Sequence, residues 1–462
     1  MAEKSAIPVE LGTEKIGRLL KQYALPAIIA QTASSLYNMV DSIFIGQGVG
    51  PLAISGLAVT FPLMNLSTAF GTLVGAGAAT MLSVLLGQKN YKAANKVLGN
   101  VVSLNVILGL LFMAVALIFI DPILYFFGAS ENTLPYAKEY IQIILYGNIV
   151  THLYFGLNAA MRSSGNPKKA MALTIFTVVF NTILDPIFIF VFDMGIAGAA
   201  WATVIAQTAA MIVVLKHFSD KSRAFHFEKG IFKLDPRVAK DSLVIGMGPF
   251  LMNAAACLVT LFINQQLRDY SGDLGIGSYG ICNRFIFMFI MICMGLNQGM
   301  QPIAGYNYGA KQYSRVKEVF WMTAKFGTIV TTICFCIGMF IPRLAAGIFT
   351  HDEALLNMSA DGMRILTIGF PIVGFQMIGT NFFQCLGMVK KSIILSLSRQ
   401  LLFLLPLLYC LPLWMGANGV WMSFPISDVL SAILTAILLR RLFKKFNTLK
   451  DGEESTILGS NL

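Results

Sequence analysis

The sequence predicts an all-α membrane protein that crosses the bilayer twelve times. Of its 462 residues, 56% are hydrophobic and only 12% are charged, and the mean hydropathy is +0.71. Soluble domains carry about 25% charged residues. Apolar runs of about 18 residues or more, the length that a membrane-spanning helix needs, recur along the whole chain. This composition excludes an ordinary soluble domain.

Six helices are predicted after a polar lead at 1–15. Pro26 lies inside the first helix. The second contains Gly71, Gly75 and Gly77, small residues that let helix backbones approach closely. The six helices are expected at 16–45, 52–85, 97–120, 134–161, 168–192 and 195–217. Together with the lead they form a predicted N-lobe, residues 1–217.

The longest polar connection, residues 218–240, is predicted to link two halves on the cytoplasmic side. Six further helices then form a predicted C-lobe, residues 241–446, and residues 447–462 form a cytoplasmic tail. The helices of the C-lobe are expected at 241–268, 274–306, 313–341, 355–386, 391–413 and 417–440.

The two halves are predicted to be a repeat. The segment GQKNYKAANKV at 87–97 matches GAKQYSRVKEV at 309–319, an offset of 222 residues. Six helices per repeat is an even number, so both halves take the same orientation in the membrane. We therefore expect a pseudo-twofold axis along the membrane normal, which suits alternating access to a cavity between two lobes.

The distribution of Lys and Arg predicts the orientation. Of the 34 basic residues, 28 fall in the two termini and the connections on their side of the membrane. Only four fall on the opposite side: Lys138, Arg268, Arg343 and Arg364. By the positive-inside rule both termini are expected in the cytoplasm. The net charge of +11 then reflects membrane topology rather than nucleic-acid binding.

Two carboxylates inside apolar helices are the first candidates for function. Asp41 lies near the end of the first predicted helix and Asp185 lies in the fifth. A charge at the centre of a membrane helix costs roughly 2.5–3.5 kcal/mol on insertion scales, so such residues are usually functional. At the repeat offset the second half has Ile263 opposite Asp41 and apolar residues opposite Asp185. We favour cation chemistry in the N-lobe over a structural role for both acids.

Depth in the membrane extends this candidate site. Asp41, Asp185 and Thr203 are expected in one layer of the outer half, because each lies a few residues from the outer end of its helix. Tyr37 shares a helix face with Asp41, and Asn181 shares one with Asp185. Carboxylate, amide and hydroxyl oxygens suit a hard cation such as Na⁺. The same carboxylates suit a proton.

Other polar residues in the spans have weaker claims. Asp428 and Arg399 lie at similar depths and are expected to form a structural ion pair, with a transport role as the alternative. Asn158 is either a polar point in a substrate cavity or an interhelical hydrogen-bonding residue. Arg284 has no acid on its own helix. No phosphate-binding loop, GxSxG or HExxH motif occurs, so neither an enzyme nor a cofactor is expected.

Four motifs resemble a known family. They are YNMVDSIFIG in the first helix, GQKN after the second, RSSGNPKKAM before the fifth and FNTILDPIFIF within it. Together with the two repeats they resemble the multidrug and toxic compound extrusion (MATE) transporters, best the DinF-type prokaryotic branch. The resemblance implies export of cationic or amphipathic compounds in exchange for H⁺ or Na⁺.

The resemblance also implies residue roles. The N-lobe cation site of the family, for H⁺ or Na⁺, falls by motif match on Asp41, Asn181, Asp185 and Thr203, with Tyr37 adjacent. The bending proline of the first helix falls on Pro26. Another branch of the family carries an acid in the seventh helix, and none occurs in the matching segment GPFLMNAAACLVTLFINQ. A C-lobe cation site is therefore not expected.

We predict a monomeric secondary active multidrug antiporter in the inner membrane of a prokaryote, whose partners are drug-like organic cations and lipid. A lipid-linked oligosaccharide flippase of the same superfamily is the first alternative. It needs a strongly basic cavity, and only Arg284 and Arg399 lie within spans. A membrane receptor or scaffold without transport is the second alternative, and it predicts that Asp41→Asn alters no activity.

Overall fold

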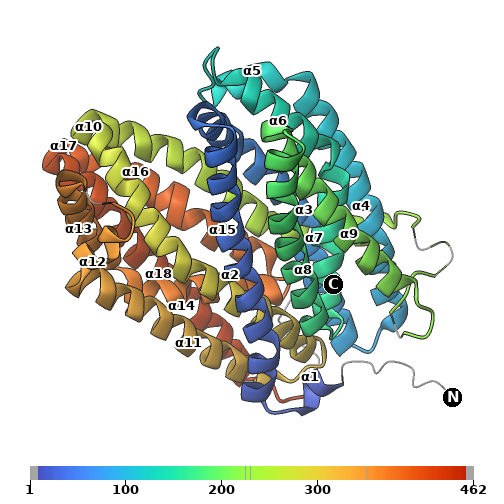
Figure 1. Ribbon diagram of the computed structural model, residues 1–462. Coiled ribbons are helices and arrows are strands. Elements are labelled where there is room, and N and C mark those ends of the chain that lie inside the picture. The colour runs from blue at the N-terminus through green and yellow to red at the C-terminus, as the bar shows by residue number, and fades with distance from the viewer. Residues whose placement is uncertain (1–8, 224, 229, 231, 351, 454–462) are drawn as a thin grey trace. The chain divides into compact units, whose positions relative to one another are not determined.

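Helices make up nearly all of the described chain (Figure 1). The computed structural model describes residues 9–223, 225–228, 230, 232–350 and 352–453, and no strand occurs among them. These residues divide into two compact units. The first comprises the described parts of Met1–Thr13 and Ile29–Phe250, and the second comprises Glu14–Ile28 and the described part of Leu251–Asn461. The all-α fold is confirmed, while the lobe boundaries drawn from the repeat stay predictions.

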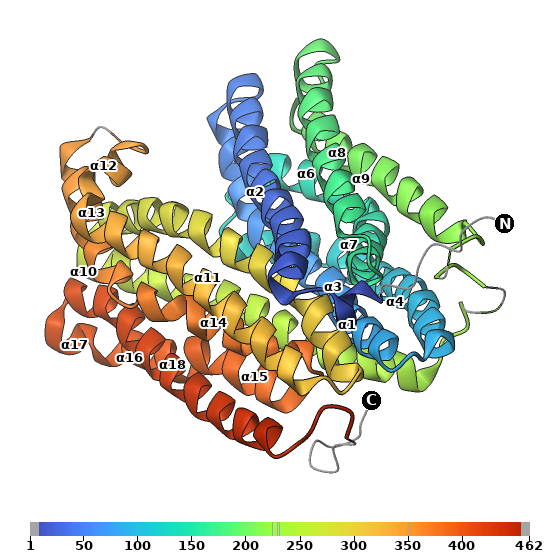
Figure 2. The same ribbon diagram turned by 90° about the horizontal axis from the view of Figure 1, so that it is seen from below.

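The first unit is built around α3, which packs against α4 and α7 (Figure 2). α9 packs in turn against α6, α7 and α8. The elements of this unit, with α2 shared between both units, are α1 Glu10–Thr13, α2 Ile16–Gly48, α3 Pro51–Gly87, α4 Tyr91–Ile118, α5 Ile120–Phe126, α6 Leu134–Tyr146, α7 Asn148–Ser163, α8 Pro167–Pro186, the π-helix η1 Ile187–Val191 and α9 Gly195–Ser219.

The glycines of α3 lie at the helix contacts that their spacing predicts. A Cβ on Gly71 would lie 3.1 Å from the His152 ring, and one on Gly75 would lie 3.3 Å from Cα of Gly156. Gly77 lies against the backbone carbonyl of Ser242. Larger side chains would push α3 away from its neighbours, so these residues serve close helix packing.

In the second unit α14 packs between α11 and α18. Aromatic rings fill this contact, with Phe320 and Phe382 centroids 4.8 Å apart and Phe443 beside both. The elements of this unit, with α10 shared between both units, are α10 Pro236–Gly309, α11 Tyr313–Phe340, α12 Pro342–Gly347, α13 Glu353–Thr367, α14 Phe370–Cys385, α15 Val389–Leu397, the π-helix η2 Ser398–Leu404, α16 Leu405–Cys410, α17 Pro412–Met415 and α18 Ala417–Asn447. α10 consists of two helices that meet at a kink at Gly272, and each is long enough to be a span of its own.

Several predicted helices are interrupted. The fourth is broken at Gly147 into α6 and α7, and the tenth is bent by 55° between α13 and α14, next to Gly369. These two glycines are 222 residues apart, so the repeat preserves the break. A Cβ on Gly147 would lie 2.5 Å from the Val204 side chain, and one on Gly369 would lie 3.2 Å from Asp428. Each break therefore packs closely on another helix, α9 at Gly147 and α18 at Gly369, where glycine leaves room for the contact.

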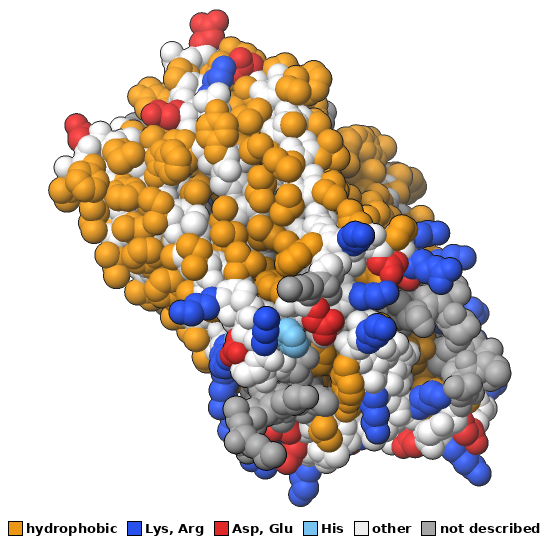
Figure 3. Space-filling view, turned by 90° about the vertical axis from the view of Figure 1, so that its right-hand side faces the viewer, with side chains coloured by type: hydrophobic (Ala, Val, Ile, Leu, Met, Phe, Trp, Pro, Cys, Tyr) orange, Lys and Arg blue, Asp and Glu red, His pale blue; other side chains and the backbone are white. Residues whose placement is uncertain are grey.

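Most of the long helices are suited to crossing a membrane. Over the described residues, nine helices are long and apolar enough to cross a bilayer, or ten if the bent pair α13–α14 is counted as one span. The first and fourth predicted spans correspond to α2 and to the pair α6–α7. On the face drawn in Figure 3, Lys and Arg gather toward one end, below a wide hydrophobic area. That pattern is typical of a lipid-facing surface with one basic rim.

Candidate functional site

The first unit brings together the polar residues that the sequence singled out in the first, fifth and sixth spans. Asp41 lies on α2, Asn181 and Asp185 lie on α8, and Thr203 lies on α9. All four are buried, with exposed fractions of 5% for Asp41, 2% for Asn181, 0% for Asp185 and 8% for Thr203. Three helices thus direct polar groups into one buried region of the unit.

Hydrogen bonding and charge connect these helices. The hydroxyls of Tyr37 and Thr203 lie 2.9 Å apart and form a hydrogen bond between α2 and α9. Asp41 and Asp185 lie close enough to repel each other electrostatically. Each carboxylate also interacts with Tyr37. The two acids therefore belong to one site, and their mutual repulsion favours a bound positive charge.

Three of the four carboxylate oxygens of Asp41 and Asp185 lack a hydrogen-bond partner among the described residues. Oδ1 of Asp41 and both carboxylate oxygens of Asp185 are buried without a hydrogen bond of good geometry, although the Asn181 side chain lies close enough to Asp185 to stabilise its carboxylate. None of the ion pairs formed by the described residues includes either acid. A buried carboxylate without a donor or a cation is strongly unfavourable, because desolvation of the charge is not offset. This arrangement suits a site that takes up a proton or a metal cation.

One neighbour of the site was missed by sequence reasoning. Tyr140 of α6 is fully buried and interacts electrostatically with both Asp41 and Asp185. Its ring packs in an apolar cluster with Ile45 and Ile189. A tyrosine in an amphipathic segment is ordinary in sequence, so no signal distinguished it. Only the packing of α6 against α3 and α9 places it there.

The end of α8 has a local cause in the sequence. Pro186 follows Asp185 directly and cannot donate a backbone hydrogen bond, which loosens a helix at that point. The chain continues as the π-helix Ile187–Val191. π-Bulges of this kind are frequent at functional sites. A Cβ on Gly198 would lie 2.9 Å from the Phe188 backbone, so η1 also packs closely on α9.

Two other predicted residues have surroundings of their own. Nδ2 of Asn158 donates a hydrogen bond of 3.1 Å to the carbonyl of Ala170, which ties α7 to α8. This contact is the interhelical alternative considered for Asn158. Pro26 is buried in the part of α2 that belongs to the second unit. A role for either residue in substrate coupling stays a prediction.

The second unit contains a buried ion pair. Nε of Arg399 donates to Oδ1 of Asp428 at 2.6 Å, and the side chains are 27% and 3% exposed. Arg399 lies on η2, and the Ser427 hydroxyl also donates to its backbone carbonyl at 2.6 Å. Asp428 is therefore neutralised inside the protein, unlike the two acids of the first unit.

A cation fits the donor set of the first unit. Asp41 and Asp185 would provide unpartnered carboxylate oxygens, Asn181 an amide and Thr203 a hydroxyl. These are hard oxygen ligands. No group of three or more His, Cys, Asp or Glu in the described part of the chain has a metal-binding arrangement. The oxygen ligands of the site suit a proton or a monovalent cation such as Na⁺.

Known proteins resemble this chain over nearly its full length. The family model MatE matches residues 26–187 and 249–410. "Multidrug export protein MepA" of Staphylococcus aureus (strain MRSA252) is 28% identical over 426 residues, which cover 92% of this chain and 94% of that protein.

Two solved structures show the same fold. The MATE multidrug transporter DinF-BH, solved in complex with a ligand, is 37% identical with a TM-score of 0.88, covering 95% of this chain and 98% of that one. An outward-facing multidrug resistance MATE family transporter of the MOP superfamily has a TM-score of 0.90 at 22% identity. The match covers 97% of this chain and 100% of that one.

Proposed function

The chain belongs to the MatE family, and from that membership we propose that it is a secondary active multidrug antiporter. It exports cationic or amphipathic organic compounds in exchange for H⁺ or Na⁺. The family match covers both repeats. The relative MepA is named a multidrug export protein, and DinF-BH is named a multidrug transporter. These similarities support a drug-like substrate and the DinF-type branch.

One observation carries the coupling proposal. The first unit buries two carboxylates that lie within electrostatic reach of each other and have buried oxygens without a donor. A purely structural acid is normally paired, as Asp428 is with Arg399. The unpaired state of Asp41 and Asp185 supports their role as the group that loads and releases the coupling ion.

The proposed cycle links this site to substrate release. A proton or Na⁺ that enters from outside binds at Asp41 and Asp185, with Asn181 and Thr203 as further ligands for Na⁺. Binding favours the conformation from which substrate leaves outward and permits return to the inward-facing state. Coupling requires only that the ion and the substrate prefer different conformations. Each lowers the apparent affinity for the other.

The expected location follows from the charge distribution. Basic residues concentrate on the side of the two termini, which supports a cytoplasmic location for both termini; we take the membrane to be the inner membrane of a prokaryote, as the family resemblance implies. The flippase alternative finds little support. Of the two arginines predicted within spans, Arg399 is paired with Asp428, so it is not available to hold a pyrophosphate.

Transport in proteoliposomes tests the proposal. Ethidium movement is followed under an imposed pH gradient and, separately, an imposed Na⁺ gradient, for wild type, Asp41→Asn and Asp185→Asn. We expect wild-type transport under one gradient, which identifies the ion. Each substitution removes the charge that the ion neutralises, so each should abolish transport.

Asp361→Asn is the matched control for charge loss. Asp361 is an exposed acid paired with Arg364 on the same helix, and its substitution should leave transport unchanged. Transport that persists in both Asp41→Asn and Asp185→Asn would overturn the site assignment. Drug-dependent thermal stabilisation without gradient-driven transport would favour the receptor alternative.

A further inference from the structure

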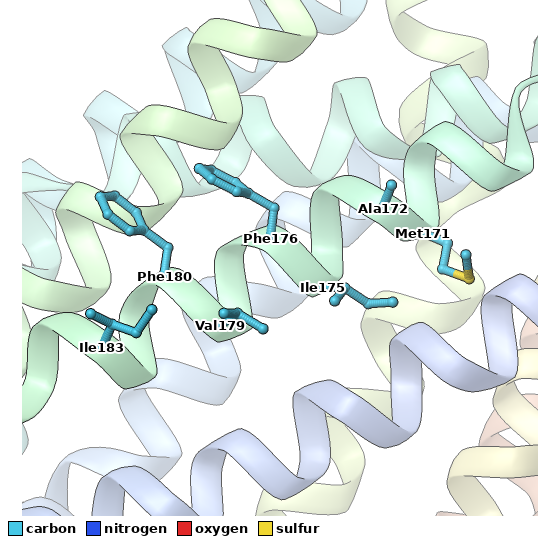
Figure 4. Close-up of a pocket in the computed structure, with 7 residues that line it drawn as sticks. All are labelled: Met171, Ala172, Ile175, Phe176, Val179, Phe180 and Ile183. Carbon is cyan, nitrogen blue, oxygen red and sulfur yellow. The ribbon is translucent and has the colours of Figure 1, made fainter.

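A long hollow runs along an exposed face of α8. Its larger part, about 480 Å³, is lined only by α8 residues, whose side chains Figure 4 shows in a row from Met171 to Ile183. A second hollow of about 330 Å³ continues from it, because Ala172 and Phe176 line both. The most apolar part of this span is only 17% buried, the lowest share among the nine candidate spans of the described chain.

The two ends of this hollow differ in chemistry. The larger part has almost purely aliphatic and aromatic walls. The smaller part reaches Lys169 and His217 at the cytoplasmic ends of α8 and α9. Both of these residues interact electrostatically with Arg223 and Asp220, which also form an ion pair of 3.2 Å. With His217 neutral, Lys169, Arg223 and Asp220 carry one net positive charge.

The length of the hollow matches the hydrocarbon thickness of one leaflet of a bilayer. From Met171 to Ile183 the helix rises over twelve residues, about 18 Å at 1.5 Å per residue. Half of the hydrocarbon core measures about 15 Å. An acyl chain in the hollow would therefore place its headgroup phosphate at Lys169 and Arg223.

From this complementarity we propose that the α8 face binds one anionic phospholipid of the cytoplasmic leaflet. The lipid phosphate pairs with the side chains of Lys169 and Arg223, and an acyl chain lies along Ala172, Phe176 and Val179. The positive end of the hollow disfavours a cationic drug in the same place. This proposal rests on the proposed function at one point only, the predicted orientation that puts Lys169 on the cytoplasmic side of the membrane.

Lipid binding to the full-length protein in detergent tests this site. Native mass spectrometry measures binding of dioleoylphosphatidylglycerol and of zwitterionic dioleoylphosphatidylcholine. We expect about one tightly held anionic lipid per protein and weaker retention of phosphatidylcholine. Lys169→Gln should weaken phosphatidylglycerol binding about fivefold, the factor for about 1 kcal/mol per surface cation. Lys221→Gln, an exposed neighbour outside the hollow, should not.

A steric variant tests the groove separately. Ala172 is exposed where the two hollows join, so Ala172→Trp fills the path of the chain without disturbing the buried side of α8. It should abolish tight retention of the lipid. Ile212→Trp places the same bulk on α9, outside both hollows, and should leave retention intact.

The outcomes are decisive for the lipid and independent of transport. Equal retention of both lipids, or equal loss in Lys169→Gln and Lys221→Gln, would overturn the site. Competition by inorganic phosphate as strong as that by the lipid would assign a free-anion site instead. No gradient is present in this assay, so a negative result leaves the antiport proposal standing, and failed transport leaves the lipid site standing.

Discussion

The partners of a buried carboxylate decide what that residue can do. Asp428 has Arg399 at 2.6 Å, whereas Asp41 and Asp185 have no cationic side chain beside them among the described residues. The paired acid is neutralised within the protein. The unpaired acids need an external positive charge to be stable away from water. This contrast between the two units gives the strongest physical reason to place ion coupling in the first.

Loss of Arg399 and loss of Asp428 should destabilise the protein to different extents. Arg399→Met leaves Asp428 buried and uncompensated, which should cost roughly 3–5 kcal/mol. Asp428→Asn leaves Arg399 without its partner, but the Arg399 side chain is 27% exposed and can reach polar surroundings. The decrease in the free energy of unfolding should therefore be smaller. Thermal unfolding of the purified variants measures both. A larger loss in Asp428→Asn than in Arg399→Met would contradict this account.

A double substitution completes the test. In Arg399→Met with Asp428→Leu no buried charge remains, so stability should recover relative to Arg399→Met alone. Ethidium transport by the double variant then separates a structural from a transport role. Retained transport agrees with a structural pair, whereas lost transport in a stable protein would assign the pair to the transport cycle.

Only part of the candidate site could be read from the sequence. Asp41, Asp185 and Asn181 stand out because polar groups are costly in an apolar helix and can be counted. Tyr140 could not be found in this way. A tyrosine is ordinary in an amphipathic helix, and its proximity to the acids arises from how α6 packs in the first unit.

At the level of helices, close contacts depend on individual glycines. In the second unit, Gly299 of α10 lies directly against the backbone of Ala24 on α2, whereas a Cβ on Gly280 of the same helix would meet nothing within 4 Å. Two glycines on one helix therefore have opposite roles. One permits helix approach, and the other merely lowers helix propensity.

We expect Gly299→Ala to destabilise the protein. The added methyl group meets backbone rather than a flexible side chain, and overpacking of this kind costs about 1–3 kcal/mol. Gly280→Ala should be neutral or stabilising, because alanine favours helix by about 1 kcal/mol over glycine. The unfolding temperatures of Gly299→Ala and Gly280→Ala, each compared with wild type, test this difference. Equal effects would show that α2 can move away from α10 without loss.

Equivalent helices of the two repeats are capped in different ways. In the first unit, the Asn90 side chain accepts a 3.2 Å hydrogen bond from the Ala93 amide at the start of α4. In the second, Gln312 makes no such bond, and Asp451 of the tail accepts from the amide of Ser314 at 3.1 Å and from its hydroxyl. The tail thus supplies the cap that α11 lacks.

The cap predicts a pH-dependent contribution to stability. Burial alone would raise the pKa of Asp451, but hydrogen bonds from Ser314 outweigh it and lower the pKa below its ordinary value. The cap therefore stabilises the folded protein fully at pH values above the ordinary pKa of Asp, about 3.9. This stabilisation is lost as the pH falls through the lowered pKa of Asp451. Asp451→Ala should cost about 1 kcal/mol at neutral pH.

Unfolding temperature against pH checks this contribution. The difference between wild type and Asp451→Ala should shrink as the solution becomes acidic. Asp451→Asn keeps an acceptor for the Ser314 amide and should restore most of the loss without pH dependence. A difference that stays constant down to low pH would indicate packing rather than a charged cap.

The extent of each helix was predictable, but its interruptions were not. Apolar runs locate most of the spans, because a spanning helix satisfies its backbone hydrogen bonds internally and faces lipid with apolar side chains. Nine helices of the described chain, or ten with the bent pair α13–α14, are long and apolar enough to cross a bilayer. The breaks at Gly147 and beside Gly369 depend on neighbouring helices that lie against them, Val204 in one unit and Asp428 in the other. Those contacts are distant in sequence. The 222-residue spacing of the two glycines becomes meaningful only once both breaks are seen.

At the scale of the whole molecule, charge predicts orientation. Ser130 and Ser222 are exposed in connections that are expected on opposite sides of the membrane. After the exposed Cys336 and Cys410 are replaced by Ser, we expect a membrane-impermeant maleimide to label Ser130→Cys in intact cells. Ser222→Cys should react only after permeabilisation. The reverse labelling pattern would invert the topology and place the termini outside.

The sequence by itself determined the class, the repeat, the family resemblance and the four polar residues of the candidate cation site. These follow from composition and local spacing, because burying polar groups in lipid is costly enough to leave a countable pattern. The family is confirmed by the MatE match over both repeats. Only the tertiary structure decided which acids are paired, which glycines touch a neighbour and where Tyr140 lies. Those depend on contacts between helices far apart in the chain, which no local pattern encodes.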